Sequence, residues 1–157
     1  MKNSKKIVIK LGSSLLTNKR GGVNKAVLKN VVKDIVWLLN SKKEVVVVSS
    51  GAISLGRGKL NLKNDLTLNE SQAVAARGQI ELMTAWKNEF KKYKKQVAQI
   101  LLSPSDIKNK NSSKNAMGTL ENLLNFQCVP IINENDTTSS DEIKFGDNDI
   151  LAAQIAV

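Results

Sequence analysis

The side chains in this sequence that could do chemistry lie at the ends of short apolar segments. They come in groups that are small, polar and rich in serine, asparagine, glycine or aspartate. The four groups are Gly12-Ser13-Ser14, Ser49-Ser50-Gly51-Ala52, Asn133-Glu134-Asn135-Asp136 and Gly146-Asp147-Asn148-Asp149. Such groups offer hydroxyls, amides, carboxylates and backbone N–H donors, which suit a phosphate or the polar backbone of an amino acid.

Lys10, two residues before Gly12, is the cation that accompanies the first group. A lysine on an otherwise apolar strand costs desolvation free energy unless an anion pairs with it. A neighbouring glycine also lets backbone N–H groups approach a phosphate. The alternative is a lysine on an edge strand that reaches solvent. The chain has no GxxxxGK[ST] loop and no GxGxxG after a strand, so the common nucleotide-binding loops are absent.

The other three groups each have a purely structural alternative. Ser49–Ala52 could hold a carboxylate or phosphate at a helix N-terminus, or it could only supply a capping serine. Asn133–Asp136 and Gly146–Asp149 could bind an amino-acid backbone, or they could only form turns, with Asp147 as the cap of the last helix.

The elements that must position these groups follow from the apolar pattern. Buried strands are predicted over 7–11, 45–48, 97–102 and 128–132. Between them we predict helices from a cap at Asn24 to Leu39, over 53–56, from Asn69 or Glu70 to Tyr93, around 117–124 and from Asp147 onward. A turn is predicted over 103–106 and a hairpin over 137–145.

This alternation predicts an α/β fold, a three-layer α/β/α sandwich with a mainly parallel sheet. Ligands of such sheets bind beyond the carboxyl ends of the strands, and three of the four polar groups fall there. Their convergence on one edge therefore argues for a binding site more strongly than any single group does.

Composition limits the chemistry that this site can use. The 157 residues suit a single domain, and no linker or repeat divides them. The single cysteine, Cys128, excludes an internal disulfide, and without a signal peptide or membrane span we expect a cytoplasmic protein. The lack of histidine excludes Ser-His-Asp and Cys-His catalysis. Phosphoryl transfer to a carboxylate still fits, because that acceptor is ionised at neutral pH and needs no general base.

The net charge of +10 raises the possibility of nucleic-acid binding, which the details do not favour. Only three of the 24 basic residues are arginine, and the densest lysine run, Lys87–Lys95, falls on the predicted solvent face of a helix. Six of the 14 acidic residues lie between Glu134 and Asp149 instead. This acidic segment suggests a site for ammonium groups or metal ions.

Taken together, the motifs resemble the glutamate 5-kinases, a branch of the amino acid kinase family. The resemblance runs in order from Lys6 to Val157. It rests on Ile7-Val8-Ile9-Lys10-Leu11-Gly12-Ser13-Ser14, Val48-Ser49-Ser50-Gly51-Ala52-Ile53, Pro130-Ile131-Ile132-Asn133-Glu134-Asn135-Asp136 and Gly146-Asp147-Asn148-Asp149. It implies the amino acid kinase fold and ATP-dependent phosphorylation of the L-glutamate side-chain carboxylate with Mg²⁺. The product would be L-glutamyl 5-phosphate, in the first step of proline biosynthesis.

The resemblance also implies roles for individual residues. Lys10, with the amides of Gly12 and Ser13, would bind the ATP phosphates, and Asp149 would orient Lys10 rather than act as a base. The other matching positions would bind glutamate, with Asp136 at its ammonium group. These positions are Ser50, Gly51, Ala52, Asn133, Asp136 and Asn148. No residue is assigned as a metal ligand.

The family further implies a homo-oligomer and proline as a feedback inhibitor. Because Ile150–Val157 is apolar and lacks a glycine cap, we expect a truncated domain. Residues 1–157 would be the N-terminal, glutamate-binding part of an amino acid kinase domain, without its nucleotide-binding C-terminal part and without a PUA domain. Two alternatives stay open: an inactive glutamate- or proline-binding fragment that needs a partner chain to complete the ATP site, and a nucleic-acid binder.

Overall fold

The computed structural model of the protein describes residues 5–138 and 147–156. In chain order its elements are β1 (Lys6–Leu11), α1 (Ser13–Leu16), α2 (Lys25–Asn40), β2 (Glu44–Ser49), α3 (Ala52–Leu60), α4 (Leu68–Lys91), β3 (Gln96–Leu102), α5 (Pro104–Lys108), α6 (Lys110–Asn125), β4 (Cys128–Glu134) and α7 (Asp147–Ile155). The hairpin predicted over 137–145 falls largely outside the described residues.

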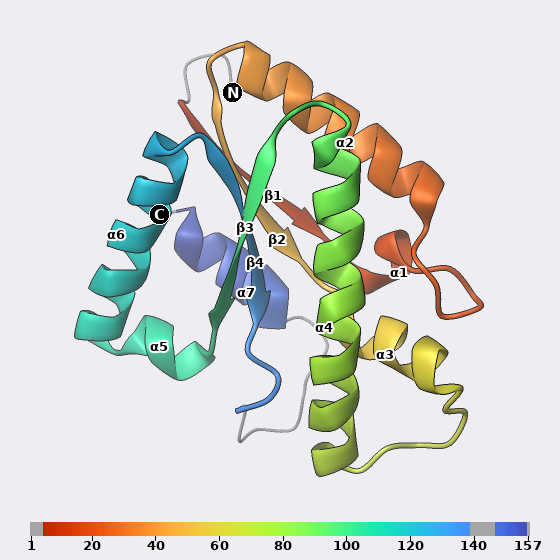
Figure 1. The fold of residues 1–157 in the computed structure, drawn as a ribbon. Helices are drawn as coiled ribbons and strands as arrows, with labels where there is room; N and C mark the ends of the chain where they lie inside the picture. Colours follow the sequence, from red (N-terminus) through yellow and green to blue (C-terminus); the bar gives the residue numbers. More distant parts are fainter. Residues whose placement is uncertain (1–4, 139–146, 157) are drawn as a thin grey trace.

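The described strands form one parallel sheet in the order β1-β2-β4-β3 (Figure 1). The predicted parallel sheet is therefore confirmed, and β1 and β3 are its edges. All four strands run the same way, so the residues that follow β1, β2 and β4 lie together at the carboxyl ends of the strands. Ligands of α/β sheets are expected to bind there.

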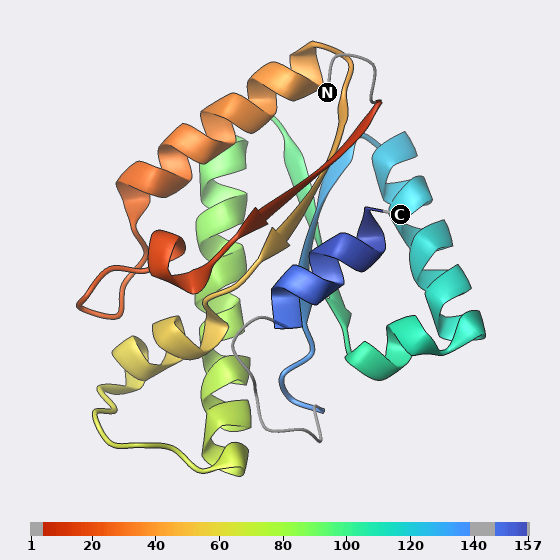
Figure 2. The same ribbon diagram turned by 180° about the vertical axis from the view of Figure 1, so that it is seen from behind.

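Helices cover both faces of this sheet, so the predicted three-layer sandwich is confirmed (Figures 1 and 2). In β2 the valines alternate between the two layers. Val45 and Val47 belong to a core with α2 and α4, whereas Val46 and Val48 belong to a second core with α6 and α7. A strand buried on both faces has to be apolar throughout, which is why this run was recognisable in the sequence.

Capping side chains decide where several helices begin. Asn24 caps α2 through its side-chain oxygen, which accepts a hydrogen bond from the Val27 N–H, as predicted. Thr67 and Glu70 form a reciprocal capping box, which starts α4 at Leu68, slightly before the predicted start. The turn predicted over 103–106 is wrong. Ser103 and Asp106 form a second capping box, and Pro104 begins the short helix α5.

Two glycines bring α3 and α4 together at backbone distance. A Cβ atom at Gly78 would overlap the Ala52 carbonyl oxygen, and one at Gly56 would overlap the Val74 carbonyl oxygen. A third close contact joins Gly58 of α3 to Gly21, in the loop between α1 and α2. These contacts fix α3 and that loop beside the carboxyl end of the sheet.

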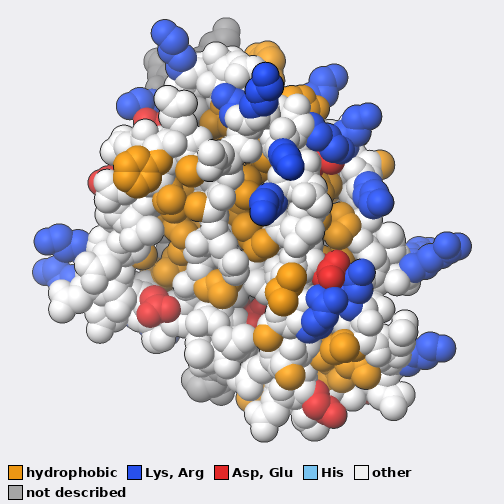
Figure 3. All heavy atoms as spheres, viewed as in Figure 1, with side chains coloured by type: hydrophobic (Ala, Val, Ile, Leu, Met, Phe, Trp, Pro, Cys, Tyr) orange, Lys and Arg blue, Asp and Glu red, His pale blue; other side chains and the backbone are white. Residues whose placement is uncertain are grey.

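The lysine run at the end of α4 is confirmed in part, because α4 ends at Lys91 and Lys92, Lys94 and Lys95 follow the helix. Trp86 and Phe90 are fully buried, while Lys87 and Lys91 are exposed. Figure 3 shows the basic side chains spread over this face among neutral and apolar ones, without one continuous patch. Among the described residues, no helix is both long and apolar enough to cross a membrane.

Candidate active site

An open pocket of about 1150 Å³ lies at the carboxyl ends of β1, β2 and β4. It brings together every residue to which the family resemblance assigns a role. These are Lys10, Gly12, Ser13, Ser50, Gly51, Ala52, Asn133, Asp136, Asn148 and Asp149. They come from four separate stretches of the chain, so their convergence is a property of the fold and not of sequence proximity.

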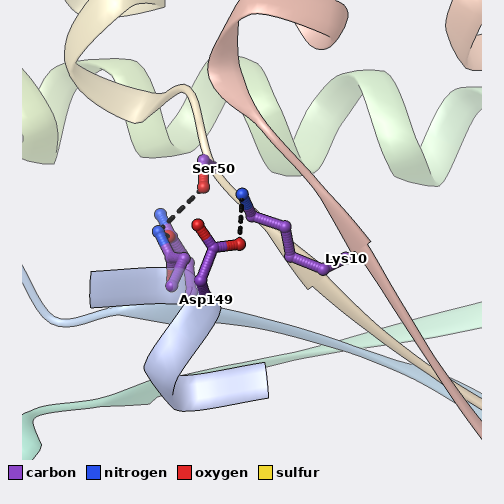
Figure 4. Close-up of polar contacts among 5 residues, drawn as sticks. Lys10, Ser50 and Asp149 are labelled. Atoms are coloured by element: carbon purple, nitrogen blue, oxygen red, sulfur yellow. Dashed lines mark hydrogen bonds and ion pairs between the residues drawn. The ribbon is translucent and has the colours of Figure 1, made fainter. Parts of the chain in front are cut away.

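Lys10 and Asp149 form an ion pair at this edge of the sheet. Lys10 Nζ lies 2.6 Å from Asp149 Oδ1, and the two side chains are 31% and 63% exposed (Figure 4). Lys10 lies on the edge strand β1, so both predictions for it hold in part, because it reaches towards solvent and also meets an anion. A half-exposed ion pair stabilises a fold little. The lysine can therefore exchange Asp149 for another anion at small cost.

Gly12 lies directly beside this lysine. A Cβ atom at position 12 would come 3.7 Å from Lys10 Nζ, and Ser13 then begins the four-residue helix α1. The absence of a side chain at Gly12 keeps the ammonium group open on the side of the following backbone. This arrangement suits an oxyanion that contacts both the lysine and the backbone of Gly12 and Ser13.

The chain turns sharply after β2 and presents Ser50 to the pocket. Gly51 has φ of 114°, a left-handed conformation that favours glycine, and it caps α3 without a side-chain hydrogen bond. The alternative of a capping serine is therefore wrong. The preceding hydroxyl, Ser49, is fully buried and accepts a hydrogen bond of 3.0 Å from Trp86 Nε1. The neighbouring serines thus have different environments, one in the core and one in the pocket.

A chain of amide hydrogen bonds connects Ser50 to the interior. Asn148 Nδ2 donates to Ser50 Oγ at 2.9 Å and to Asn133 Oδ1 at 3.2 Å. Asn133 Nδ2 in turn donates to Gln79 Oε1 at 2.8 Å. We call these four residues the amide chain. Asn133 is only 2% exposed, so these bonds fix its side chain away from water.

The group 133–136 is divided between strand and turn. Asn133 and Glu134 are the last residues of β4, which the sequence predicted to end at Ile132, and both are buried. The turn follows, with the Asn135 N–H donating to the Leu102 carbonyl. The turn interpretation is therefore wrong for Asn133, whose side chain is held by the amide chain.

Several residues in or next to the pocket were not predicted from the sequence. Gln79 stands in the middle of α4, and no periodicity or motif distinguishes it from its neighbours. Four basic residues on the pocket rim were also not predicted. They are Lys19 and Arg20 in the loop after α1, and Arg57 and Lys63 in and after α3. The Asn18–Gly22 run has turn composition, and Asn18 Oδ1 does accept hydrogen bonds from the N–H groups of Arg20 and Gly22.

Two carboxyl groups at the starts of helices have lowered pKa values, and both lie outside the pocket. The Thr67 backbone N–H, followed by its hydroxyl, lowers the pKa of Glu70. The Ser103 hydroxyl, followed by its backbone N–H, lowers the pKa of Asp106. Both are capping carboxylates, and their shifts reflect helix starts and not catalysis.

The acidic segment, which the sequence predicts to bind ammonium groups or metal ions, is only partly among the described residues. Asp141, Glu142 and Gly146 lie outside the described residues, and of Asp147 only its place at the start of α7 is described. No group of three or more cysteine, aspartate or glutamate side chains suited to a metal ion occurs among the described residues.

Comparisons with known proteins identify similar chains. The model of the amino acid kinase family matches residues 5–157. A glutamate 5-kinase of Pelagibacter ubique (strain HTCC1062) is 47% identical over 157 residues, which are 99% of this chain and 43% of that protein. A glutamate 5-kinase of Geobacter sp. (strain M21) is 45% identical over 156 residues, covering 99% and 42% respectively. The chain thus spans less than half the length of these curated relatives.

Proposed function

The chain belongs to the amino acid kinase family, and from this we propose that the intact protein transfers the γ-phosphoryl group of ATP to the side-chain carboxylate of L-glutamate. The products are L-glutamyl 5-phosphate and ADP, and the reaction serves proline biosynthesis. The names of the relatives support the substrate. The observation that carries the proposal is the pocket in which the Lys10–Asp149 pair lies beside Ser50 and Asn148.

The bond changes of this reaction need positioning and charge neutralisation more than acid–base chemistry. An oxygen of the glutamate carboxylate attacks the γ-phosphorus, and the bond between that phosphorus and the β–γ bridging oxygen breaks. ADP leaves with the electron pair, and no proton moves. A cation near the transferred group stabilises the charge that develops on its oxygens.

Lys10 is the proposed source of that cation. Its Nζ lies 2.6 Å from Asp149 Oδ1, and it is proposed to contact the γ-phosphoryl oxygens when ATP binds. The backbone of Gly12 and Ser13 lies next to the same position. Asp149 acts as the positioning residue of the lysine. It abstracts no proton, because the acceptor is already ionised.

Glutamate is proposed to lie across Ser50, Gly51 and Ala52 on one side and the end of β4 on the other. The Ser50 hydroxyl and the amides at the start of α3 suit a carboxylate. Asp136, with Asn133 and Asn148 beside it, suits the ammonium group. We assign Mg²⁺ no protein ligand and infer that it enters with the ATP phosphates, to which Mg²⁺ is commonly bound in kinases.

Residues 1–157 are proposed to be the glutamate-binding part of the domain. The match covers 43% of one of the relatives and 42% of the other, and the rest of the ATP site is proposed to lie in a C-terminal part of the domain. No specific observation favours an inactive binding fragment or a nucleic-acid binder over this function. A homo-oligomer, inhibition by proline and a cytoplasmic location belong to the proposal and are tested by sedimentation, by assay with proline and by cell fractionation.

The test is an assay of the intact protein with ATP, glutamate and hydroxylamine, which traps an acyl phosphate as its hydroxamate. We expect γ-glutamyl hydroxamate to form in proportion to ADP. Aspartate and N-acetylglutamate are the matched alternative substrates, each with a carboxylate. Turnover of either in place of glutamate contradicts the substrate assignment, and ADP release without hydroxamate contradicts carboxylate phosphorylation.

A further inference from the structure

Gln79 is the member of the amide chain that does not line the active-site pocket. It lies on α4 and borders a smaller neighbouring cavity of about 280 Å³. Its Oε1 atom nevertheless accepts the hydrogen bond from Asn133 Nδ2 that anchors the chain. We propose that Gln79 is a positioning residue, which sets the direction of the whole amide chain and so leaves the Ser50 hydroxyl proton for an anionic group of the ligand. The ligand's identity as glutamate rests on the proposed function.

The direction of each hydrogen bond follows from the one before it. Gln79 offers an acceptor, so Asn133 turns its NH₂ group towards α4 and its Oδ1 towards Asn148. Asn148 must then present its NH₂ group to Asn133, and the same NH₂ group also donates to Ser50 Oγ. Because Ser50 accepts from Asn148, it does not spend its own proton on that contact. A serine hydroxyl has one proton to give, and it is free to point to another acceptor.

The opposite direction would present a different pocket to the ligand. If Asn133 turned over, its NH₂ group would face the NH₂ group of Asn148, and two donors cannot bond. Asn148 would have to turn as well and offer Oδ1 to its neighbours. Ser50 would then donate its proton to Asn148 and would meet a ligand carboxylate with oxygen lone pairs, which repel it.

Because Asn133 is buried, the group that Gln79 presents to it, an acceptor or a donor, decides the direction of the amide chain. Asn133 is 2% exposed, so solvent is poorly placed to replace a missing partner for its NH₂ group, and an unpaired buried donor is costly. The other end of the Gln79 side chain is not part of the argument. Its Nε2 atom is buried and has no hydrogen-bond partner among the described residues. Asn148 Oδ1 is likewise buried without a hydrogen-bond partner among the described residues, so the direction of the chain rests on the bond that Gln79 Oε1 accepts from Asn133.

The test separates the acceptor from the bulk of the side chain. Gln79→Met keeps a similar length without an acceptor oxygen. Gln79→Glu keeps the acceptor oxygen, but it replaces the unpartnered NH₂ group by a second oxygen and adds a charge when it is ionised. In the intact protein we expect Gln79→Met to raise the KM for glutamate about tenfold, with kcat and the KM for ATP within about twofold. Gln79→Glu should stay within about threefold of wild type. Gln99→Met is the matched control, since Gln99 borders the same small cavity and is exposed.

Three results overturn the inference. They are a glutamate KM for Gln79→Met within twofold of wild type, an equal rise in Gln79→Glu, and a parallel loss of kcat and ATP affinity, which would indicate general damage. A second measurement does not depend on the substrate. Selective ¹⁵N labelling of asparagine reports the side-chain amides, and we expect the protected Asn133 NH₂ signal to lose protection in Gln79→Met but not in Gln79→Glu. If the wild type fails to phosphorylate glutamate, the proposed function falls, and this measurement still decides the role of Gln79.

Discussion

The active-site pocket has two walls that are built by different means. One wall consists of the strand ends and the start of α7, with Lys10, Ser50, Asn133, Asn148 and Asp149, and side-chain hydrogen bonds and an ion pair connect it. We call it the strand-end wall. The other, the rim wall, consists of the loop 18–21 and residues 57–63, and contacts of glycine with backbone hold it in place. In the proposed function the first wall supplies the groups that bind and react, and the second borders the pocket on its other side.

The difference shows two kinds of functional residue. On the strand-end wall, a side chain is needed for the atoms it carries, so its loss should change binding or turnover. On the rim wall, a glycine is needed because it has no side chain. Its substitution by a larger residue should therefore lower the free energy of unfolding and displace the neighbouring backbone. Three predictions test this division, and a fourth concerns a helix cap outside both walls.

The largest effect is expected at Lys10. Lys10→Met keeps the stem of the side chain but removes the charge, so turnover of the intact protein should fall about 1000-fold because developing charge on the phosphoryl group is not neutralised. Glutamate affinity, measured by calorimetry, should change less than about threefold. Lys87→Met, on the exposed face of α4, is the control and should keep full turnover. An unchanged turnover in Lys10→Met would remove Lys10 from the mechanism.

The next effect is expected at the contact between α3 and α4. Gly78→Ala would push a methyl group into the Ala52 carbonyl oxygen, and we expect the free energy of unfolding to fall by about 3 kcal/mol in urea titrations. Gly118 of α6 is the matched control, because a Cβ atom there meets nothing within 4 Å. Gly118→Ala should raise stability by about 0.5–1 kcal/mol. Equal effects of the two substitutions would contradict the close contact.

Neighbouring serines provide a sharper comparison of pocket and core. Ser50→Ala should raise the KM for glutamate about tenfold at nearly unchanged stability, because it removes a ligand-facing hydroxyl. Ser49→Ala should lower the free energy of unfolding by about 1 kcal/mol, because it leaves the buried Trp86 Nε1 donor unpaired, and it should leave the KM unchanged. If the two variants exchange these phenotypes, the assignment of Ser50 to the pocket is wrong.

The smallest effect is expected far from both walls, at the capping box of α5. The pKa of Asp106 is lowered from its ordinary value of 3.8 by Ser103, so its ionised form stabilises the folded state. That contribution is fully present above the ordinary pKa and is lost as the pH falls through the lowered pKa. Asp106→Asn should therefore cost about 0.5 kcal/mol at pH 7, and the difference from wild type should vanish at the acid end of a series of urea titrations. A difference that persists in acid would contradict the cap.

Much of the strand-end wall could be predicted from the sequence because its residues follow apolar strands. Val45–Val48 has to be apolar since both faces of β2 are buried, and the polar residues after it have to lie at the ligand edge of a parallel sheet. Lys10, Ser50 and Asn133 could be predicted for the same reason. The family resemblance then added their chemical roles.

Other features could not be predicted because they depend on pairs of residues distant in the chain. Gln79 is an ordinary helical glutamine until Asn133, 54 residues later, meets it. In the sequence, Gly56 and Gly78 are residues that disfavour a helix. Only the close contact between α3 and α4 shows why a side chain is not tolerated at either position. The short helix α5 was predicted as a turn because serine followed by proline is typical both of a turn and of the start of a helix.

The exposed ion pair between Lys10 and Asp149 has a consequence for the end of the proposed reaction cycle. An acyl phosphate is a strongly anionic product, and a lysine without another partner would retain it. Asp149, 2.6 Å from Lys10 Nζ in this structure, competes with the product for the same ammonium group. In the proposed mechanism, the aspartate that positions the lysine before transfer would also shorten the residence time of the product, so Asp149→Asn should slow product release as well as chemistry.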